Sequence, residues 1–560
     1  MHRFIGLFIV HNLNTLSAIT SLNTSPVFGW SPKVPAVATE RIRYGALCDA
    51  AQETLPKKTN SNVARSAYRM MRRAGIAWKI PSSLFSYQKP DGSFLDMSYN
   101  RPTDIVKFLI GHHPFVLSGA DDALHMESVC EAFWGAYKQF HGSHKVFETH
   151  GDNLSHVIPL ALHGDEGKGK RRSSTVIASL EAVVGIKGRE DTCQSCQPSY
   201  LDLSVWGDCE IGDHATAKAL KTNMKSHSYL QHWPLFMVPG TLNKEFKPLT
   251  LKMLELISDD LKELFTTGVE VQNQRWFVGI VGAKGDLRWH SKQARLTRGY
   301  ENKSTVRDLE CCHCCMAGRA GLPAEDIATE SPCWLRTMWR QRPWHPQNPP
   351  ALFSIPYDSS KPEMMYKHDV FHTLRLGLHR DFVGSVVFLF MRWGLFGGGR
   401  IEDKLECAHS HFKLWQIAEK KSASLRSFSK ALFKYTSTKS FPWLNGKGSD
   451  VTLCLKWLSA ATSGFLHQGV GDAGKKKVME IILSCSRTAV AFFDEMNNHG
   501  LFVNAGCAAK IYELGHSYLK GYNWLANFAF QSQLCLFSIK PKAHFYRHIL
   551  LELREQLQNN

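Results

Sequence analysis

VIPLALHGDEG at residues 157–167 is the stretch that decides the fold class. Its apolar run continues as far as His163 and then gives way to Gly, Asp and Glu. A short apolar run bounded by glycine and charged residues is typical of a buried strand. The stretch therefore predicts a buried strand that ends in acidic residues, with Asp165 at that end.

Three further strands and a helix follow along the chain. The same reasoning predicts strands at residues 174–186 (STVIASLEAVVGI), 232–238 (HWPLFMV) and 275–286 (RWFVGIVGAKGD). Residues 249–266 place leucine and isoleucine at helical spacing with charges on the opposite side, which predicts an amphipathic helix. The order strand, strand, strand, helix, strand predicts an α/β fold with a mixed sheet over residues 151–300.

The rest of the chain divides into three regions by composition. Residues 1–150 alternate loops with short amphipathic helices, including a basic one at residues 64–80 whose charges are more typical of a solvated face than of phosphate contacts. Residues 301–366 combine a Cys-rich patch with a Pro- and Trp-rich linker that is poor in regular structure. Residues 367–560 are predicted to be mostly helical.

Composition and charge limit the class of protein. Of the 560 residues, 44% are apolar and 11% are aromatic, which is enough for several cores and excludes wholesale disorder. Lys and Arg outnumber Asp and Glu by 67 to 50, and the net charge of +17 favours a polyanionic partner, although a merely basic globular protein has the same surplus. The apolar part of MHRFIGLFIV (residues 1–10) is too short for a membrane span and atypical of a secretory signal, so we expect neither membrane association nor secretion.

Asp165 and Asp286 stand at the ends of the first and fourth predicted strands. Phosphodiester cleavage and strand transfer use divalent cations held by carboxylates from neighbouring strands, and strand-end aspartates in a mixed sheet supply that geometry. Turn aspartates are also common at strand ends, so spacing alone leaves both interpretations open. GDEGKGK at residues 164–170 has phosphate-loop spacing, but Arg171 replaces the Ser or Thr that would hold magnesium, which disfavours an NTPase.

Several cysteines form tight clusters instead of spreading as in a disulfide framework, which indicates a reducing compartment. The run CCHCC contains two overlapping CxxC pairs, Cys311/Cys314 and Cys312/Cys315. Such knuckles bind zinc readily, so we expect these residues to hold a structural Zn²⁺, with free buried cysteines as the alternative. One knuckle needs two more ligands, and either Cys193 with Cys196 or His372 with Cys333 could provide them.

The succession of motifs from Tyr229 to His372 resembles the catalytic region of DDE-type DNA transposases of the CACTA (En/Spm-like) kind. In that family a strand that contains a hydrophobic WP motif comes first, and a long helix follows it. After the helix come a strand that ends in an acidic turn, a stretch with Thr, Lys and Gly, a CxxC knuckle and a DxxH element, in that order. The corresponding stretches here are HWPLFMVP (232–239), LELISDDLKELFTTGVE (254–270), GDLRWHSK (285–292), LTRGYENK (296–303), CCHCCMAG (311–318) and LFSIPYDSSKPEMMYKHDVFHTLRLG (352–377). Each motif is short, and it is their order that carries the resemblance.

The resemblance implies a transposon-derived protein with an RNase H-like core, interrupted by a Cys-rich knuckle and a mostly helical insertion. Asp165 would be the first catalytic carboxylate and Asp286 the second, both binding Mg²⁺ or Mn²⁺. Asp369 and His372 match the DxxH element and are further candidate ligands. The implied activity is the cleavage of DNA at transposon ends, followed by strand transfer. A DNA partner in turn implies location in the nucleus, and a homo-oligomer is compatible with this activity.

The third carboxylate of the family follows an element that KPKAHFYRHI (540–549) resembles, so we expect it beyond Asn560, with Glu552 and Glu555 as substitutes. A copy without it would lose most catalysis, because neither ion would be held at its working distance. The alternatives to an active transposase are a non-catalytic, zinc-containing nucleic-acid-binding protein, a free-standing metal-dependent nuclease, and a globular protein with no nucleic-acid role.

Overall fold

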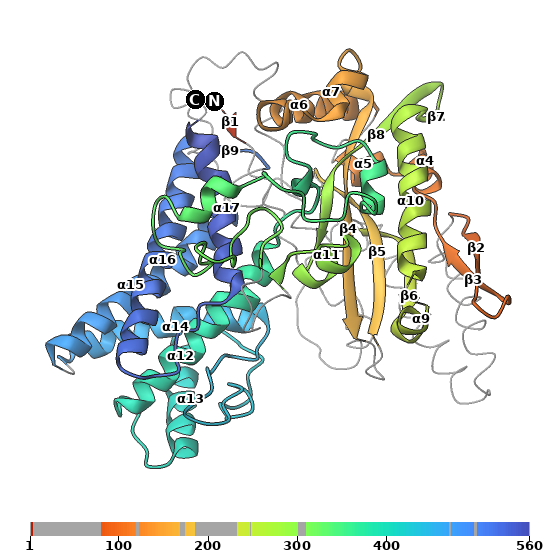
Figure 1. The fold of residues 1–560 in the computed structure, drawn as a ribbon. Coiled ribbons are helices and arrows are strands. Elements are labelled where there is room, and N and C mark those ends of the chain that lie inside the picture. The colour runs from red at the N-terminus through yellow and green to blue at the C-terminus, as the bar shows by residue number, and fades with distance from the viewer. Residues whose placement is uncertain are drawn as a thin grey trace, which may run out of the picture.

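The computed structural model describes residues 2–3, 80–118, 123–168, 174–184, 232–246, 248–300, 310–469, 472–497 and 501–558. Within these ranges, a β-sheet with its covering helices lies on one side of the molecule and a body of long helices on the other (Figure 1). The α/β fold class is therefore confirmed. The basic helix expected at residues 64–80 lies outside the described residues, apart from Ile80.

The sheet has seven strands in the order β2-β3-β6-β5-β4-β8-β7. Their bounds are β2 (Ser83–Gln88), β3 (Phe94–Tyr99), β4 (Val157–Lys168), β5 (Ser174–Ala182), β6 (His232–Pro239), β7 (Val269–Val271) and β8 (Gln274–Gly285). Only β4 and β8 pair in parallel, and the other ladders are antiparallel, so this sheet is mixed. The four predicted strands are confirmed as β4, β5, β6 and β8. The prediction that the first strand ends at Asp165 is wrong, because pairing with β5 continues β4 to Lys168. The continuation of β4 through Lys168 makes Gly164–Lys168 a strand, not a phosphate loop.

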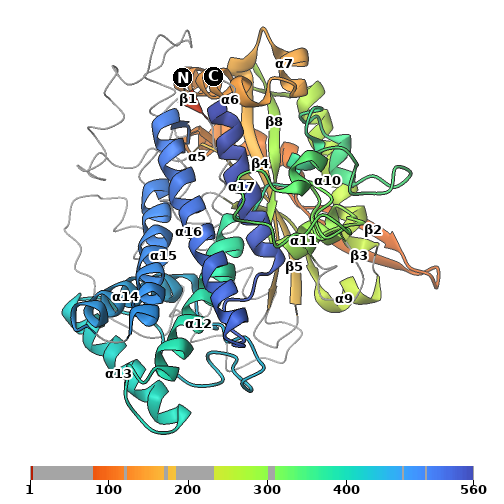
Figure 2. The same cartoon turned by 60° about the vertical axis from the view of Figure 1, so that its left-hand side comes forward.

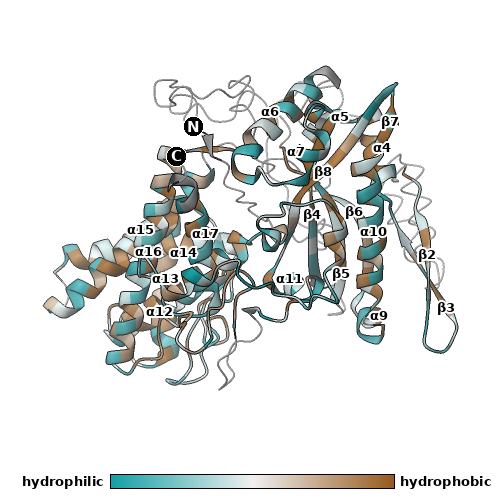
Figure 3. Ribbon diagram, turned by 45° about the horizontal axis from the view of Figure 1, so that its top comes forward, coloured by the Kyte–Doolittle hydropathy of each residue, from teal (hydrophilic) through white to brown (hydrophobic). Residues whose placement is uncertain are grey.

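Helices cover the sheet. They are α4 (Pro102–His112), α5 (Pro114–Ser118), α6 (Ala123–His141), α7 (Lys145–His150), α9 (Gly240–Glu245), α10 (Leu249–Thr266) and α11 (Leu287–Gln293), with a 3-10 turn η1 (Leu154–His156). The predicted amphipathic helix is α10, with both ends where the sequence places them. Its Met253, Ile257 and Leu261 belong to the buried core shared with the strands, and the face visible in Figure 3 is mostly hydrophilic.

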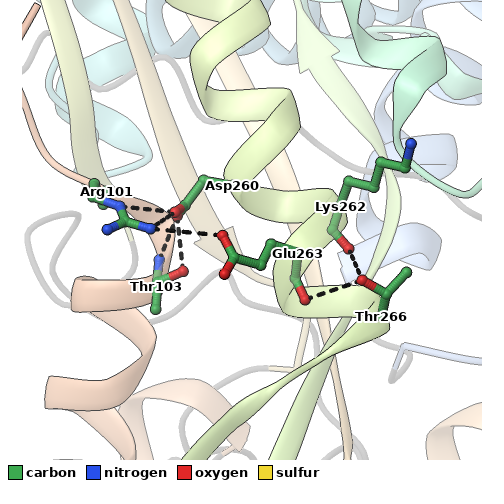
Figure 4. A network of polar contacts seen from close by, with 6 residues as sticks. All are labelled: Arg101, Thr103, Asp260, Lys262, Glu263 and Thr266. Carbon is green, nitrogen blue, oxygen red and sulfur yellow. Dashed lines mark hydrogen bonds and ion pairs between the residues drawn. The ribbon is translucent and has the colours of Figure 1, made fainter.

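An aspartate on α10 supplies the N-terminal cap that α4 lacks (Figure 4). The buried Asp260 carboxylate accepts hydrogen bonds from the Thr103 backbone N–H (2.8 Å) and hydroxyl (3.0 Å), and from the Arg101 guanidinium (2.6 and 2.9 Å). Pro102 at the first helical position has no N–H that needs a partner. One carboxylate therefore both caps α4 and holds it against α10.

The helical body begins at residue 371. It comprises a π-helical segment η9 (Phe371–Leu378), α12 (His379–Arg392), α13 (Ile401–Ala418), α14 (Gly448–His467), α15 (Ala473–Asn497), α16 (Ala505–Gln531) and α17 (Pro541–Gln558), and a two-residue strand β9 (Val503–Asn504) that pairs with β1 (His2–Arg3). Helices α15, α16 and α17 lie side by side (Figure 2). Fully buried Phe382, Trp457 and Leu519 lie in a core separate from that of the sheet. The mostly helical character predicted for this region is confirmed.

The Cys-rich segment, residues 310–366, contacts both the sheet and the helical body. Its regular structure consists of three 3-10 turns, η6 (Cys333–Thr337), η7 (Ala351–Ser354) and η8 (Pro362–Met365). The fully buried Arg547 of α17 donates hydrogen bonds to the carbonyls of Thr329 (3.0 Å) and Glu330 (3.2 Å), which anchors α17 on this segment. None of the described helices has the length and apolarity needed to cross a membrane.

Candidate active site and metal centre

Asp165 lies inside β4, and Asp286 directly follows the end of β8, the parallel neighbour of β4. Gly164 of β4 is in register with Gly285 of β8, and Asp165 and Asp286 are the residues that follow this pair. Both aspartates are partly exposed, whereas the residues before them are buried. The parallel pairing of β4 and β8 therefore brings the two carboxylates to the same part of the sheet.

The electrostatics of the pair reflect its closeness. Burial raises the pKa of Asp165, and the nearby negative charge of Asp286 raises this pKa further. The backbone N–H of Glu166 donates to Asp165 Oδ1 at 2.7 Å, and this bond opposes the shift. Asp286 also caps α11, because its Oδ1 accepts the Trp289 backbone N–H at 2.6 Å. Two like charges on neighbouring strands would be relieved by a cation between them.

The DxxH residues lie next to this pair. Residue 366 forms a parallel bridge with Ala283 of β8, and the Lys367 N–H donates to the Ala283 carbonyl at 2.9 Å, which carries the following residues past the end of β8. The buried Asp369 carboxylate accepts the His372 backbone N–H (2.9 Å) and makes a short contact with the His372 imidazole. The charges of Asp369 and His372 both act on Asp165.

The buried Asp369 and the partly exposed His372 form an ion pair. Burial raises the pKa of Asp369, but the charge and hydrogen bonds of His372 outweigh it and hold this pKa below its usual value. Burial lowers the pKa of His372, but Asp369 outweighs it and holds this pKa above its usual value. The two residues therefore favour each other's charged forms. Within the described ranges, no third Cys, His, Asp or Glu joins Asp165 and Asp286 in a group of ligand atoms within 4.8 Å of one another.

The Cys-rich run meets α17 in a four-residue group of potential metal ligands. Cys312, Cys315, His544 and His548 are all buried, and their ligand atoms lie within 4.8 Å of one another. Cys315 Sγ lies 3.2 Å from His544 Nε2 and 3.4 Å from His548 Nε2, and Cys312 Sγ lies 3.3 Å from His548 Nε2. The two Nε2 atoms are 2.9 Å apart. Ligand atoms around a tetrahedral Zn²⁺ are separated by about 3.3–3.8 Å, so the observed distances are close to that geometry.

The thiols of the Cys-rich run and the two histidines influence one another's pKa values. Burial raises the pKa of Cys312, but hydrogen bonds with Cys314 and Cys315 and the nearby His548 and His544 outweigh it and hold this pKa well below its usual value. Burial and the neighbouring Cys312 raise the pKa values of Cys314 and Cys315. Cysteine binds a metal as the thiolate, so a bound cation would favour deprotonation of Cys312 and Cys315. This buried Cys/His cluster could hold a metal ion such as zinc.

The two completing ligands differ from the pairs considered in the sequence. Cys193 and Cys196 lie outside the described residues, His372 is bonded to Asp369, and Cys333 Sγ lies 3.5 Å from the Gly321 carbonyl. Histidines 544 and 548 take their place. Their HxxxH spacing, one helical turn apart, was the available signal. Of the other predicted zinc ligands, Cys314 belongs to a neighbouring group and Cys311, although buried, belongs to neither group.

Comparison with known proteins adds no family to this geometry. The sequence matches no protein-family model, and no curated protein matches it.

Proposed function

We propose that this chain is a transposase-derived protein of the DDE type, whose ancestral activity is divalent-metal-dependent cleavage and strand transfer of DNA in the nucleus. The observation that carries the proposal is that Asp165 and Asp286 directly follow Gly164 and Gly285, which are in register on the parallel neighbours β4 and β8. The order of strands and helices also supports the proposal. An RNase H-like core has three antiparallel strands, then a helix, then a strand parallel to the first, and this sheet has the same order.

The carboxylate pair fits a hard divalent cation. Mg²⁺ is commonly bound by one or two carboxylates, with water and substrate phosphate completing its shell, and Asp165 and Asp286 are partly exposed. When bound, such ions activate the attacking oxygen and stabilise the leaving one. Asp165 and Asp286 would hold the cation. On α11, Lys292 forms an ion pair with Glu166 (3.0 Å) and the charge of Arg288 also acts on Glu166, so positive charge lies near the residue that follows Asp165.

A second candidate function rests on the small number of carboxylates. Among the side chains that the structure describes, no third acidic group joins the pair, and Glu552 lies 3.5 Å from His368 Nε2 instead. The side chain of Glu555 lies outside the described residues. These observations favour the non-catalytic, nucleic-acid-binding alternative, in which the net charge of +17 and a structural zinc are retained without turnover.

We also infer that Cys312, Cys315, His544 and His548 bind a structural Zn²⁺. Two thiolates and two neutral imidazoles form a closed tetrahedral set, which leaves no position for a substrate. The ion would join the Cys-rich segment to α17, where Arg547 already makes hydrogen bonds between the same two parts.

The test is nicking of supercoiled DNA, and of DNA carrying candidate transposon ends, by the purified chain with Mg²⁺ or Mn²⁺. Asp165→Asn and Asp286→Asn are compared with Asp259→Asn, which changes an exposed aspartate of α10. Asn is chosen at position 286 because it can still cap α11. We expect cleavage to fall by at least about 100-fold in the first two variants, since even outer-shell partners of metal ligands contribute 10–100-fold.

Other outcomes distinguish the alternatives. DNA binding that weakens steeply with salt, is equal in all three variants and occurs without cleavage would identify the non-catalytic binding protein. Cleavage without strand transfer would identify a nuclease. Cleavage that survives both Asp165→Asn and Asp286→Asn would contradict the proposed site.

A further inference from the structure

A second group of potential metal ligands lies beside the first. His313, Cys314 and His368 are all buried, and their ligand atoms lie within 4.8 Å of one another. Cys314 Sγ is 3.6 Å from His368 Nε2, and the rings of His313 and His368 have centroids 5.1 Å apart. His313 Nε2 is buried without a hydrogen-bond partner, a cost that a ligand or an ordered water would offset.

A carboxylate lies beside His368, at the edge of this group of three. A carboxylate oxygen of Glu552 lies 3.5 Å from His368 Nε2. Glu552 stands on α17 four residues after His548 and eight after His544, and residues at this spacing lie along one stripe of a helix. The stripe HxxxHxxxE thus points three metal-binding side chains at the Cys-rich run.

The run itself alternates between the two groups. Cys312 and Cys315 belong to the first group, while His313 and Cys314 belong to the second. The Cys314 backbone N–H donates to Cys312 Sγ at 3.3 Å, so the two groups are contiguous. Each group also has the charge that a buried Zn²⁺ requires, because two thiolates neutralise the first ion and one thiolate with one carboxylate neutralises the second.

We propose that the chain binds a second Zn²⁺ through His313, Cys314, His368 and Glu552, next to the ion held by the first group. His368 immediately precedes Asp369, so this ion would fix the segment that carries the Asp369–His372 pair beside Asp165. The inference concerns metal content and does not depend on the proposed DNA chemistry.

The experiment measures zinc per chain by elemental analysis of the purified full-length protein, together with the visible spectrum of the cobalt-substituted protein. We expect two zinc ions per chain. Three thiolate-to-cobalt bonds should contribute to the charge-transfer band, from Cys312, Cys314 and Cys315. The band reports the number of thiolate ligands because imidazole and carboxylate do not contribute to it.

Substitutions assign the ions to the groups. Cys314→Ser and His368→Gln should each lower the zinc content from two to one and remove about a third of the cobalt band, because loss of the second ion removes the Cys314 thiolate-to-cobalt bond in either variant. Glu552→Gln should weaken the second ion by about 10-fold or more while leaving the first. Cys454→Ser, which changes a buried cysteine of α14 in the separate helical core, is the matched control and should retain both ions.

The wild-type chain alone can overturn the proposal. The proposal is wrong if the chain binds one zinc ion, binds no second ion on titration to about 10 μM free Zn²⁺, and shows a cobalt band from two thiolates. A content of two ions that Cys314→Ser and His368→Gln leave unchanged, in variants with wild-type circular dichroism, would contradict it as well. If those variants fail to fold, the wild-type stoichiometry and cobalt band decide the question.

Discussion

At the residue scale, two glycines allow the candidate aspartates to stand where they do. A Cβ built on Gly164 would lie 1.8 Å from the Trp289 indole, and one on Gly285 would lie 2.8 Å from the Gly164 carbonyl oxygen. The indole therefore packs directly on the backbone beside Asp165 and Asp286. Since Asp286 caps the helix that carries Trp289, the position of each of these residues depends on the others.

Gly164→Ala should destabilise the protein. The methyl group would overlap a buried ring that cannot withdraw without moving α11, so we expect the free energy of unfolding to fall by about 3 kcal/mol or more. Gly464→Ala is the control, because nothing lies within 4 Å of a Cβ there and the residue is inside α14. Gly464→Ala should raise the free energy of unfolding by about 0.5–1 kcal/mol. Denaturant unfolding measures both, and equal effects would show that Trp289 does not occupy the place described.

At the element scale, one helix supplies the terminal hydrogen bonds of another that is distant in sequence. Helix α4 has no side-chain cap of its own, and Asp260 of α10 provides one from across the interface. The same carboxylate pairs with Arg101, and this pair raises the pKa of the arginine through the hydrogen bond and the charge of Asp260. Because a cap stabilises only the helix it contacts, the α4–α10 packing and the beginning of α4 depend on each other.

Asp260→Ala should therefore separate α4 from α10. The loss of a cap and of two charge-assisted bonds predicts a decrease of about 2–3 kcal/mol in the free energy of unfolding. Hydrogen exchange should increase in the first turn of α4, from Thr103 onward. Asp259→Ala, one residue earlier and exposed, should change stability by no more than about 0.5 kcal/mol. Unchanged exchange in α4 after Asp260→Ala would refute the cross-helix cap.

At the scale of the whole molecule, the fold buries histidines in their neutral form. Burial lowers the pKa of His141 and of His144 to about 4, although Asp358 and a carbonyl, respectively, oppose the shift. Burial also lowers the pKa of His379 to about 3, between the rings of Phe493 and Tyr518. Each of these histidines binds a proton more readily in the unfolded chain than in the folded one.

The free energy of unfolding should accordingly decrease as pH falls from about 6.5 to about 4. In this window the unfolded chain takes up protons that the folded chain does not, so each such histidine removes up to about 1.4 kcal/mol per pH unit. Above about pH 6.5 the contribution is fully present. His379→Gln should flatten the slope of unfolding free energy against pH by about one proton, whereas His467→Gln, at an exposed position of α14, should not. An unchanged slope in His379→Gln would contradict the prediction.

Local patterns in the sequence determined the elements of this protein. The apolar runs predict β4, β5, β6 and β8, and the helical spacing of leucine and isoleucine predicts α10 with both of its ends. Such patterns can be recognised because a strand or helix places each side chain relative to neighbours two to four residues away. The aspartates at positions 165 and 286 were visible for the same reason, since each follows an apolar run.

Only the tertiary structure decided which of these residues meet. The register of Gly164 with Gly285 depends on how two strands pair, and Cys312 meets His548 across 236 positions of sequence. Spacing alone offered other partners for the CxxC pairs, because the ligand choice depends on where α17 packs and not on the ligands' own neighbours. Local sequence sets which side chains could bind a metal, whereas long-range packing brings their ligand atoms within 4.8 Å of one another.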